Sequence, residues 1–148
     1  LDYEVKAAYL YKLSLFVRWP ETAFSDSKAP LIVGVVGQDP FGAALDGVLA
    51  GKKVRGRPLV VKRFAGTRDL GFSHVLFIAE NDRAAARQVI RQLKDSATLT
   101  VGETGDFISD GGVIQFVMRK GMVRFRVNNE HARLAGLKVS AKLLQLSE

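Results

Sequence analysis

Four basic side chains near the C-terminal end of the chain have a spacing suited to binding an anion. Arg124 and Arg126 alternate with apolar residues in a segment typical of a β-strand, so both project from one face. Lys138 and Lys142 are four residues apart, which places them side by side on the exposed part of a helix. Because guanidinium and ammonium groups bind carboxylates and phosphates, we expect these four residues to meet an acidic partner surface or a small anionic ligand. The alternative is that they only solvate the surface.

The charge of the whole chain favours the same class of partner. The formal net charge is +7, and basic residues concentrate in 51–63 and 119–142. Such an excess attracts phosphates, nucleic acid, lipid headgroups or acidic proteins, although a solvated basic exterior is the alternative. Nucleic acid is not expected as a partner. Proteins that bind single-stranded nucleic acid interleave basic residues with exposed aromatic rings, but 119–126 has only Phe116 and Phe125 nearby, and Phe125 belongs to the apolar face of its strand.

The N-terminal segment 5–20 predicts a helix that is apolar on nearly every side, and therefore buried against a sheet or a second copy of the chain. The residues it would offer to water are Lys6, Lys12, Ser14 and Arg18. Tyr9, Phe16 and Trp19 are a candidate contact surface for a homodimer, since tyrosine and tryptophan are common interface anchors. Burial of these three rings in the monomer core is the alternative.

A phosphate-binding loop is only weakly indicated. Gly34, Gly37 and Gly42 surround a strand-to-helix junction, but their spacing matches no nucleotide-binding motif. Asp39–Pro40 already explains the junction as the capped start of a helix.

The two histidines do not suggest catalysis or metal binding. Ser73 and His74 are adjacent, but no nucleophile-elbow motif surrounds them, and His74 opens a buried strand as a structural histidine would. His131 lies in the first turn of a predicted helix and should be exposed. Two isolated histidines without cysteine do not form a transition-metal site, and we expect no cofactor.

The carboxylate pairs are equally unsuited to acid–base catalysis. Asp106 with Asp110, and Glu80 with Asp82, are spaced as in turns and helix caps. A catalytic pair would need a cleft that pushes the two pKa values apart. We therefore expect a protein that is not an enzyme.

Strands and helices alternate through the first two thirds of the chain. The expected strands are 31–37, 58–64, 74–79 and 98–102, and the helices between them are 41–49 and about 82–95. This order predicts βαβ units and a mainly parallel sheet. A hairpin of 112–118 and 122–127 follows, then a helix from Asn128 or Asn129 to near Gly136 and a last helix from Leu137. The fold class is thus α/β: a three-layer, single-domain mixed sheet flanked by helices.

Length and composition agree with one domain over 1–148. An apolar fraction of 47% supports a globular core, and no apolar run is long enough to cross a bilayer. The chain has no cysteine, which removes disulfides and thiolate chemistry.

Several segments, taken in order along almost the whole chain, resemble the YfiR family. They are Lys6–Tyr11, Phe16–Pro20, Gly34–Gly42, Gly56–Arg57, Ser73–Ile78, Leu99–Gly102, Gly111–Ile114, Val123–Asn128 and Ala135–Ser140. The resemblance implies a small periplasmic protein, exported with a signal peptide that has been removed. It further implies a homodimer that represses a membrane-bound diguanylate cyclase by binding the periplasmic sensor domain of that enzyme. In such a system, dissociation of the repressor from the cyclase raises cyclic di-GMP inside the cell and favours biofilm formation.

This chain departs from the family pattern at two positions. Family members often have cysteines at the start of the strand that here begins Ser73–His74, and at the position of Ile108. Control through disulfides cannot operate here. The leading hypothesis is a non-enzymatic regulator of a cyclase, and the alternative is a periplasmic sensor that binds a small molecule or nucleotide at the sheet's switch point.

Overall fold

The computed structural model describes residues 2–148, so of the predicted domain only Leu1 lies outside the described residues. The helices are α1 (Asp2–Phe16), α2 (Ala43–Leu49), α3 (Arg83–Gln92), α4 (Asn129–Leu134) and α5 (Ala141–Leu146), with a short 3₁₀ turn η1 (Glu21–Ala23). The strands are β1 (Val17–Arg18), β2 (Leu31–Gly37), β3 (Lys53–Val54), β4 (Arg57–Phe64), β5 (Val75–Ala79), β6 (Leu99–Gly102), β7 (Ile114–Arg119), β8 (Met122–Val127) and β9 (Lys138–Val139).

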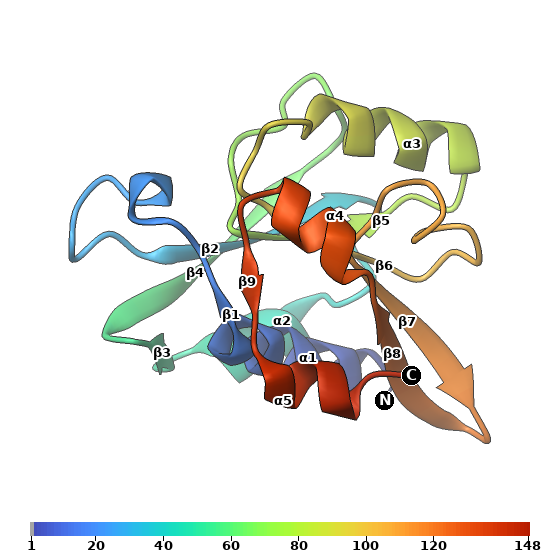
Figure 1. Cartoon of the computed structure of the whole chain (residues 1–148), viewed down its shortest axis with the longest axis horizontal. Coiled ribbons are helices and arrows are strands. Elements are labelled where there is room, and N and C mark those ends of the chain that lie inside the picture. The colour runs from blue at the N-terminus through green and yellow to red at the C-terminus, as the bar shows by residue number, and fades with distance from the viewer. Residues whose placement is uncertain (1) are drawn as a thin grey trace.

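Seven strands form one sheet in the order β3-β4-β2-β5-β6-β7-β8. The five central strands run parallel to one another, and the edge strands β3 and β8 are antiparallel to β4 and β7. Helix α3 lies on one face of the sheet, and α1, α2 and α5 lie on the other (Figure 1). The predicted α/β fold, with a mainly parallel sheet between helical layers and a C-terminal hairpin, is confirmed.

Each sheet face has its own hydrophobic core. The larger core joins α1 and α2 to inward-facing strand residues such as Val33, Phe77 and Phe116. The smaller core joins α3 to the opposite face through Leu76, Ile78 and Phe107, among others. β2 is buried on both faces because these layers cover it, as its unbroken apolar run predicts.

The ring of Phe107 fills a slot between two glycines. A methyl group added at Gly102 would lie 2.4 Å from this ring, and one added at Gly112 would lie 2.2 Å from it. Both positions therefore require glycine for packing, since any side chain would overlap the buried ring.

Helix α1 is buried on one face only, because Val5 and Leu15 are exposed, and two of its polar residues are not in water. The fully buried apolar residues of α1 are Ala7, Leu10 and Leu13. The prediction that Lys6 and Ser14 face solvent is wrong. The Lys6 amine contacts a carboxylate oxygen of Glu103 at 2.5 Å, and the Ser14 hydroxyl donates to the Leu10 carbonyl at 2.8 Å. Each buried polar group has a partner, which is the condition under which such groups are tolerated.

The boundaries of the first and last helices differ from the prediction. The last helix was expected to begin at Leu137, but Lys138–Val139 forms β9 and pairs with β1. Helix α5 begins only after Ser140, whose hydroxyl accepts the N–H of Leu143. Helix α1 likewise ends at Phe16, where β1 starts, rather than near Pro20. Two-residue strands have too little periodicity to be detected from sequence.

Asp39 was expected to cap a helix starting at Phe41. Its carboxylate accepts the Phe41 N–H at 2.8 Å, but this closes a local turn. The helix begins at Ala43, after Gly42 with a φ of 54°. Two candidate caps were expected for each of the next helices, Asn81 or Asp82 for α3 and Asn128 or Asn129 for α4. The caps are Asp82 and Asn128, because both side chains accept a backbone N–H of the first turn.

Candidate functional site

The four predicted anion-binding residues lie in two separate places. Arg124 and Arg126 are exposed and lie on edge strand β8, paired with Val117 and Gln115 of β7. This places both guanidinium groups on the sheet face opposite the one that packs against α1, where Phe125 is buried. Lys138 and Lys142 belong to β9 and α5, on the α1 side of the sheet.

Lys138 has a cationic neighbour that the sequence did not indicate. In the antiparallel pair of β1 with β9, Lys138 lies directly opposite Arg18. Both side chains are exposed. Like charges directly opposite each other in an antiparallel pair are destabilising, so the fold concentrates positive charge here at a cost to its stability.

Arg55 adds a third cation beside this pair. Its guanidinium group donates to the carbonyl oxygens of Leu15 at 3.1 Å and Val17 at 2.8 Å. It thereby satisfies free carbonyls at the C-terminal end of α1. The pKa of Arg55 is lowered, first by burial and then by the charges of Arg18 and Arg57. We call Arg18, Arg55 and Lys138 the basic β1–β9 surface.

Lys142 and Phe16 adjoin the basic β1–β9 surface. The N–H of Ser140, which lies between Lys138 and Lys142 in the chain, donates to the carbonyl of Phe16 at 2.9 Å. Lys142 is exposed, and Phe16 is half-buried. The basic β1–β9 surface therefore combines residues that are far apart in the chain: Arg18, Arg55 and Lys138.

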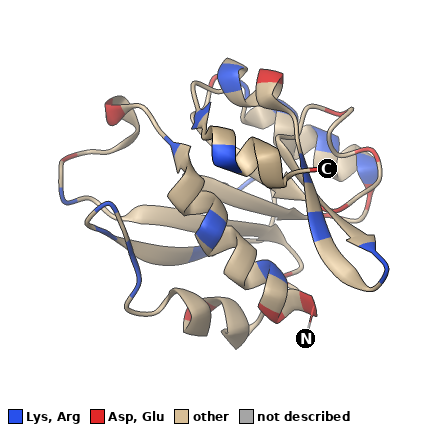
Figure 2. Ribbon diagram, turned by 60° about the horizontal axis from the view of Figure 1, so that its bottom comes forward, with Lys and Arg blue, Asp and Glu red and all other residues tan. Residues whose placement is uncertain are grey.

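Much of the basic stretch 51–63 is already paired within the molecule. Arg63 binds Asp39 at 2.6 Å and Asp46 at 2.8 Å, and its hydrogen bonds to the Asp46 carboxylate lower the pKa of that group. Arg57 donates to two backbone carbonyls and stacks 3.7 Å from the centre of the Phe24 ring. In Figure 2 the basic residues accordingly lie on many elements rather than on one continuous face.

The three predicted contact aromatics differ in exposure. Trp19 is only 8% exposed, and its indole N–H donates to the His74 carbonyl at 3.0 Å. Tyr9 is half-buried, with its ring 5.9 Å from that of Phe116 and 5.8 Å from that of Phe125. Phe16 and Tyr9 thus keep surface that a partner could cover, whereas Trp19 keeps little.

His74 is a structural residue, as its position at the start of a buried strand predicted. It is 2% exposed. Its Nδ1 accepts the N–H of Ile32 at 3.0 Å, so its Nε2 carries the proton and donates to the carbonyl of Ala23 at 2.8 Å. Both ring nitrogens are occupied, so His74 does not activate the neighbouring Ser73, whose hydroxyl has no partner within residues 2–148.

The remaining polar candidates have structural partners. Asp110 receives two hydrogen bonds from Arg83, which lowers the pKa of its carboxyl group. His131, expected to be exposed, is half-buried, with its Nδ1 3.0 Å from the carbonyl oxygen of Gly112. Within residues 2–148 no three His, Asp or Glu side chains are grouped to hold a metal ion.

The switch point of the sheet lies between the carboxyl ends of β2 and β5, where ligands of doubly wound folds bind. A cavity of about 60 Å³ is present there, lined in part by Gln38, Glu80 and Glu103. Small-molecule sites are commonly 300–1,000 Å³, about fivefold or more larger. This cavity does not accommodate a nucleotide.

The residues that sequence reasoning missed are Arg18 and Arg55. Arg18 was counted as a solvent-facing helix residue, and Arg55 as one member of a basic run. Only the pairing of β1 with β9 brings them to Lys138. A possible signal was the break in helical character at Trp19–Pro20, which marks the chain leaving α1.

Comparison with known proteins assigns the chain to a family. A search of curated proteins gives no match. No helix of residues 2–148 is long and apolar enough to cross a membrane. The model of the YfiR/HmsC-like family matches residues 3–148, which is essentially the whole chain. The chain belongs to the YfiR/HmsC-like family, a family of periplasmic regulators rather than of enzymes.

Proposed function

We propose that this protein is a periplasmic repressor that binds the sensor domain of a membrane-bound diguanylate cyclase and lowers cyclic di-GMP production. Family membership supports a regulator that acts on a partner sensor protein. The basic β1–β9 surface supports a specific docking site for an acidic patch on that partner. Lys142, which adjoins it, belongs to the same site.

The opposed pair of Arg18 and Lys138 carries this proposal. The two cations are held together by backbone pairing, so they remain close whether or not a partner is bound. An acidic partner surface removes the repulsion between them, and that relief favours the complex. Complementary charge also speeds association and suppresses binding to other basic surfaces.

Repression requires only occupancy of the sensor. If the repressor binds the inactive conformation of the sensor more tightly than the active one, binding shifts the equilibrium toward the inactive state. A preference of about 10⁴-fold, or roughly 5.5 kcal/mol, moves a two-state system from almost fully active to almost fully inactive. No chemical step by the repressor is needed.

A homodimer is a second part of the proposal. The half-buried rings of Tyr9 and Phe16 lie on α1, which also exposes Val5 and Leu15 to solvent. A second copy packed on this helix would cover apolar area at both ends of α1. Arg124 and Arg126 remain candidates for a separate contact, because they lie on the far face of the sheet.

The experiment is co-expression of this protein with each membrane-bound diguanylate cyclase of its own organism that has a periplasmic sensor domain. Intracellular cyclic di-GMP is measured with the wild-type protein, with no protein, and with a variant carrying Arg18→Glu and Lys138→Glu. A low concentration of cyclic di-GMP with the wild-type protein and a high concentration in the other two strains support the proposal. Equal concentrations in all three strains contradict it. A Lys28→Glu, Lys62→Glu double variant, which changes two exposed lysines away from this surface, controls for the same change in net charge.

A further inference from the structure

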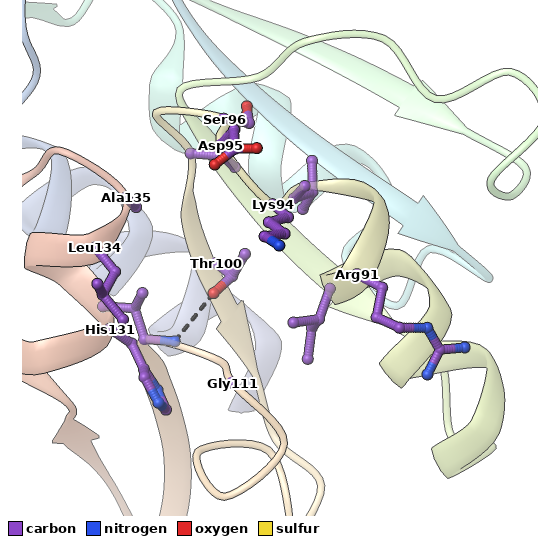
Figure 3. Close-up of a pocket in the computed structure, with 13 residues that line it drawn as sticks. Arg91, Lys94, Asp95, Ser96, Thr100, Gly111, His131, Leu134 and Ala135 are labelled. Carbon is purple, nitrogen blue, oxygen red and sulfur yellow. Dashed lines mark hydrogen bonds between the residues drawn. The ribbon is translucent and has the colours of Figure 1, made fainter.

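A second cavity, far larger than the one at the switch point, lies between α3 and α4 (Figure 3). Its volume is about 410 Å³, within the range of small-molecule sites. One side is the C-terminal part of α3, the other is α4, and the floor is formed by β6 and the segment that leads into β7. The predicted docking and dimer residues do not contribute to its wall.

The apolar part of the wall of this α3–α4 cavity is aliphatic. It contains Ile90, Leu93, Val113, Leu134 and Ala135, and the only aromatic ring is the imidazole of His131. Leu134 at the mouth is 74% exposed, the highest value among the large apolar side chains described. Covering such a side chain favours binding by about 25 cal/mol for each Å² removed from water. The wall therefore selects an apolar body, and the lack of flat rings favours an alkyl chain over an aromatic one.

Two groups at the floor and rim can hold an anionic head. Thr100 is 5% exposed, and its hydroxyl oxygen accepts the N–H of Val113 at 3.0 Å. The hydroxyl hydrogen has no acceptor within the described part of the chain, so a buried donor is left for a ligand. Figure 3 shows the Lys94 amine directed toward the space in front of Thr100, whereas the Arg91 guanidinium group points away from it.

Lys94 is available to a ligand. It is exposed and forms no ion pair or side-chain hydrogen bond with residues 2–148. The Lys94 ammonium group and the Thr100 hydroxyl can each donate to one oxygen of a single carboxylate. Hydrogen bonds to a charged group are stronger than those between neutral groups, so a carboxylate is favoured over a neutral head. A phosphate dianion would need more donors than this floor supplies. The carboxylate of Asp95, which also lines the cavity, repels a dianion more strongly than a monoanion.

We infer that the α3–α4 cavity is a binding site for a small aliphatic carboxylate, with its carboxylate on Lys94 and Thr100 and its alkyl chain against Leu93, Val113 and Leu134. This inference does not depend on the proposed repression of a cyclase. It assigns the protein a ligand whose chemistry differs from that of the acidic surface proposed to dock on the basic β1–β9 surface.

The test compares three probes with the same chain and different heads: octanoate, 1-octanol and octylamine, each below its micellar concentration. Binding to the full chain is measured by calorimetry and by the rise in melting temperature. Octanoate should bind at millimolar or lower concentration, at least tenfold more tightly than 1-octanol, and octylamine should not bind. No binding of octanoate, or equal binding of octanoate and 1-octanol, overturns the inference.

Two exposed positions provide variants that should still fold. Lys94→Glu should weaken octanoate binding at least tenfold, which is about 1.4 kcal/mol, while leaving the melting temperature of the free protein unchanged. Leu134→Ser should weaken octanoate and 1-octanol together, because it removes only apolar surface. Lys62→Glu is the charge control and should bind octanoate as the wild type does. Unchanged affinity in Lys94→Glu contradicts the site, and none of these outcomes bears on cyclic di-GMP levels.

Discussion

Arg18 and Lys138 lie directly opposite each other in the antiparallel pair of β1 and β9. They are 120 positions apart in the chain, and each is exposed. The Arg55 guanidinium group binds the backbone carbonyl of Val17, next to Arg18, at 2.8 Å. A surface that only needed to be soluble would not require three cations in contact with the same two-stranded pair. Their arrangement is explained if an acidic partner covers them.

Reversal of one charge in this pair should stabilise the free protein. In Arg18→Glu, a repulsive cross-strand pair becomes an attractive one, so the free energy of unfolding should rise by about 0.2–1 kcal/mol. The gain should shrink in high salt, because both groups are exposed and screened. Urea unfolding of both proteins at low and high salt measures it. A loss of stability in Arg18→Glu would mean that Arg18 has an attractive partner in the folded state.

Stability should fall as the solution becomes acidic, through His74. Burial, which is the largest cause, lowers the pKa of His74 below its ordinary value of 6.5. The unfolded chain therefore binds a proton near pH 6.5 while the folded chain does not, and stability decreases as pH falls below about 6.5. Above that pH this contribution is constant.

A His74→Gln variant tests the assignment. Its unfolding free energy should vary less between pH 7.5 and pH 5 than that of the wild type. It should also be lower at pH 7.5, by about 1–3 kcal/mol, if the buried N–H of Ile32 is left without an acceptor. Chemical unfolding at the two pH values gives both quantities. An unchanged slope would assign the pH dependence to another group.

Gly112→Ala should destabilise the protein by about 1–3 kcal/mol, because the new methyl group overlaps the ring of Phe107. Gly47→Ala is the matched control: no atom lies within 4 Å of the added methyl group, and the position is inside α2. That control should be stabilised by about 0.5–1 kcal/mol. Thermal unfolding of the two variants distinguishes the sites, and equal effects would contradict the packing described around Phe107.

Tyr9→Ala should lower the free energy of unfolding by about 2–4 kcal/mol, since the ring packs on Phe116 and Phe125. Sedimentation equilibrium of the same variant measures dimer formation. If Tyr9 is part of a dimer contact, the association constant falls as well. An unchanged association constant assigns the ring to the monomer core alone.

Long, regular elements could be predicted from sequence. The apolar run of β2 is buried on both sides by helices, so its composition alone indicates a central parallel strand. In β8, exposed Arg124 and Arg126 alternate with buried Val123 and Phe125, and a period of two residues identifies both faces. The caps Asp82 and Asn128 could be predicted to within one residue for a local reason: each bonds a backbone N–H two or three residues away.

Features that depend on distant partners could not be predicted. Lys6 is buried only because Glu103, 97 positions away, accepts its charge. The site residues Arg18 and Lys138 come together through strands of two residues each, which leave no periodic pattern. The α3–α4 cavity depends on how two helices flank β6, and nothing in the sequence of either helix indicates a gap between them.

The most direct test is the affinity of the purified protein for the isolated periplasmic sensor domain of the diguanylate cyclase proposed as its partner. Binding is measured at two salt concentrations for the wild type, for the Arg18→Glu, Lys138→Glu double variant and for the Lys28→Glu, Lys62→Glu control, which has the same net charge. We expect the Arg18→Glu, Lys138→Glu variant to bind at least tenfold more weakly, about 1.4 kcal/mol, and to lose most of the salt dependence, while the control binds as the wild type does. Equal affinity and equal salt dependence in all three proteins would contradict docking through the basic β1–β9 surface.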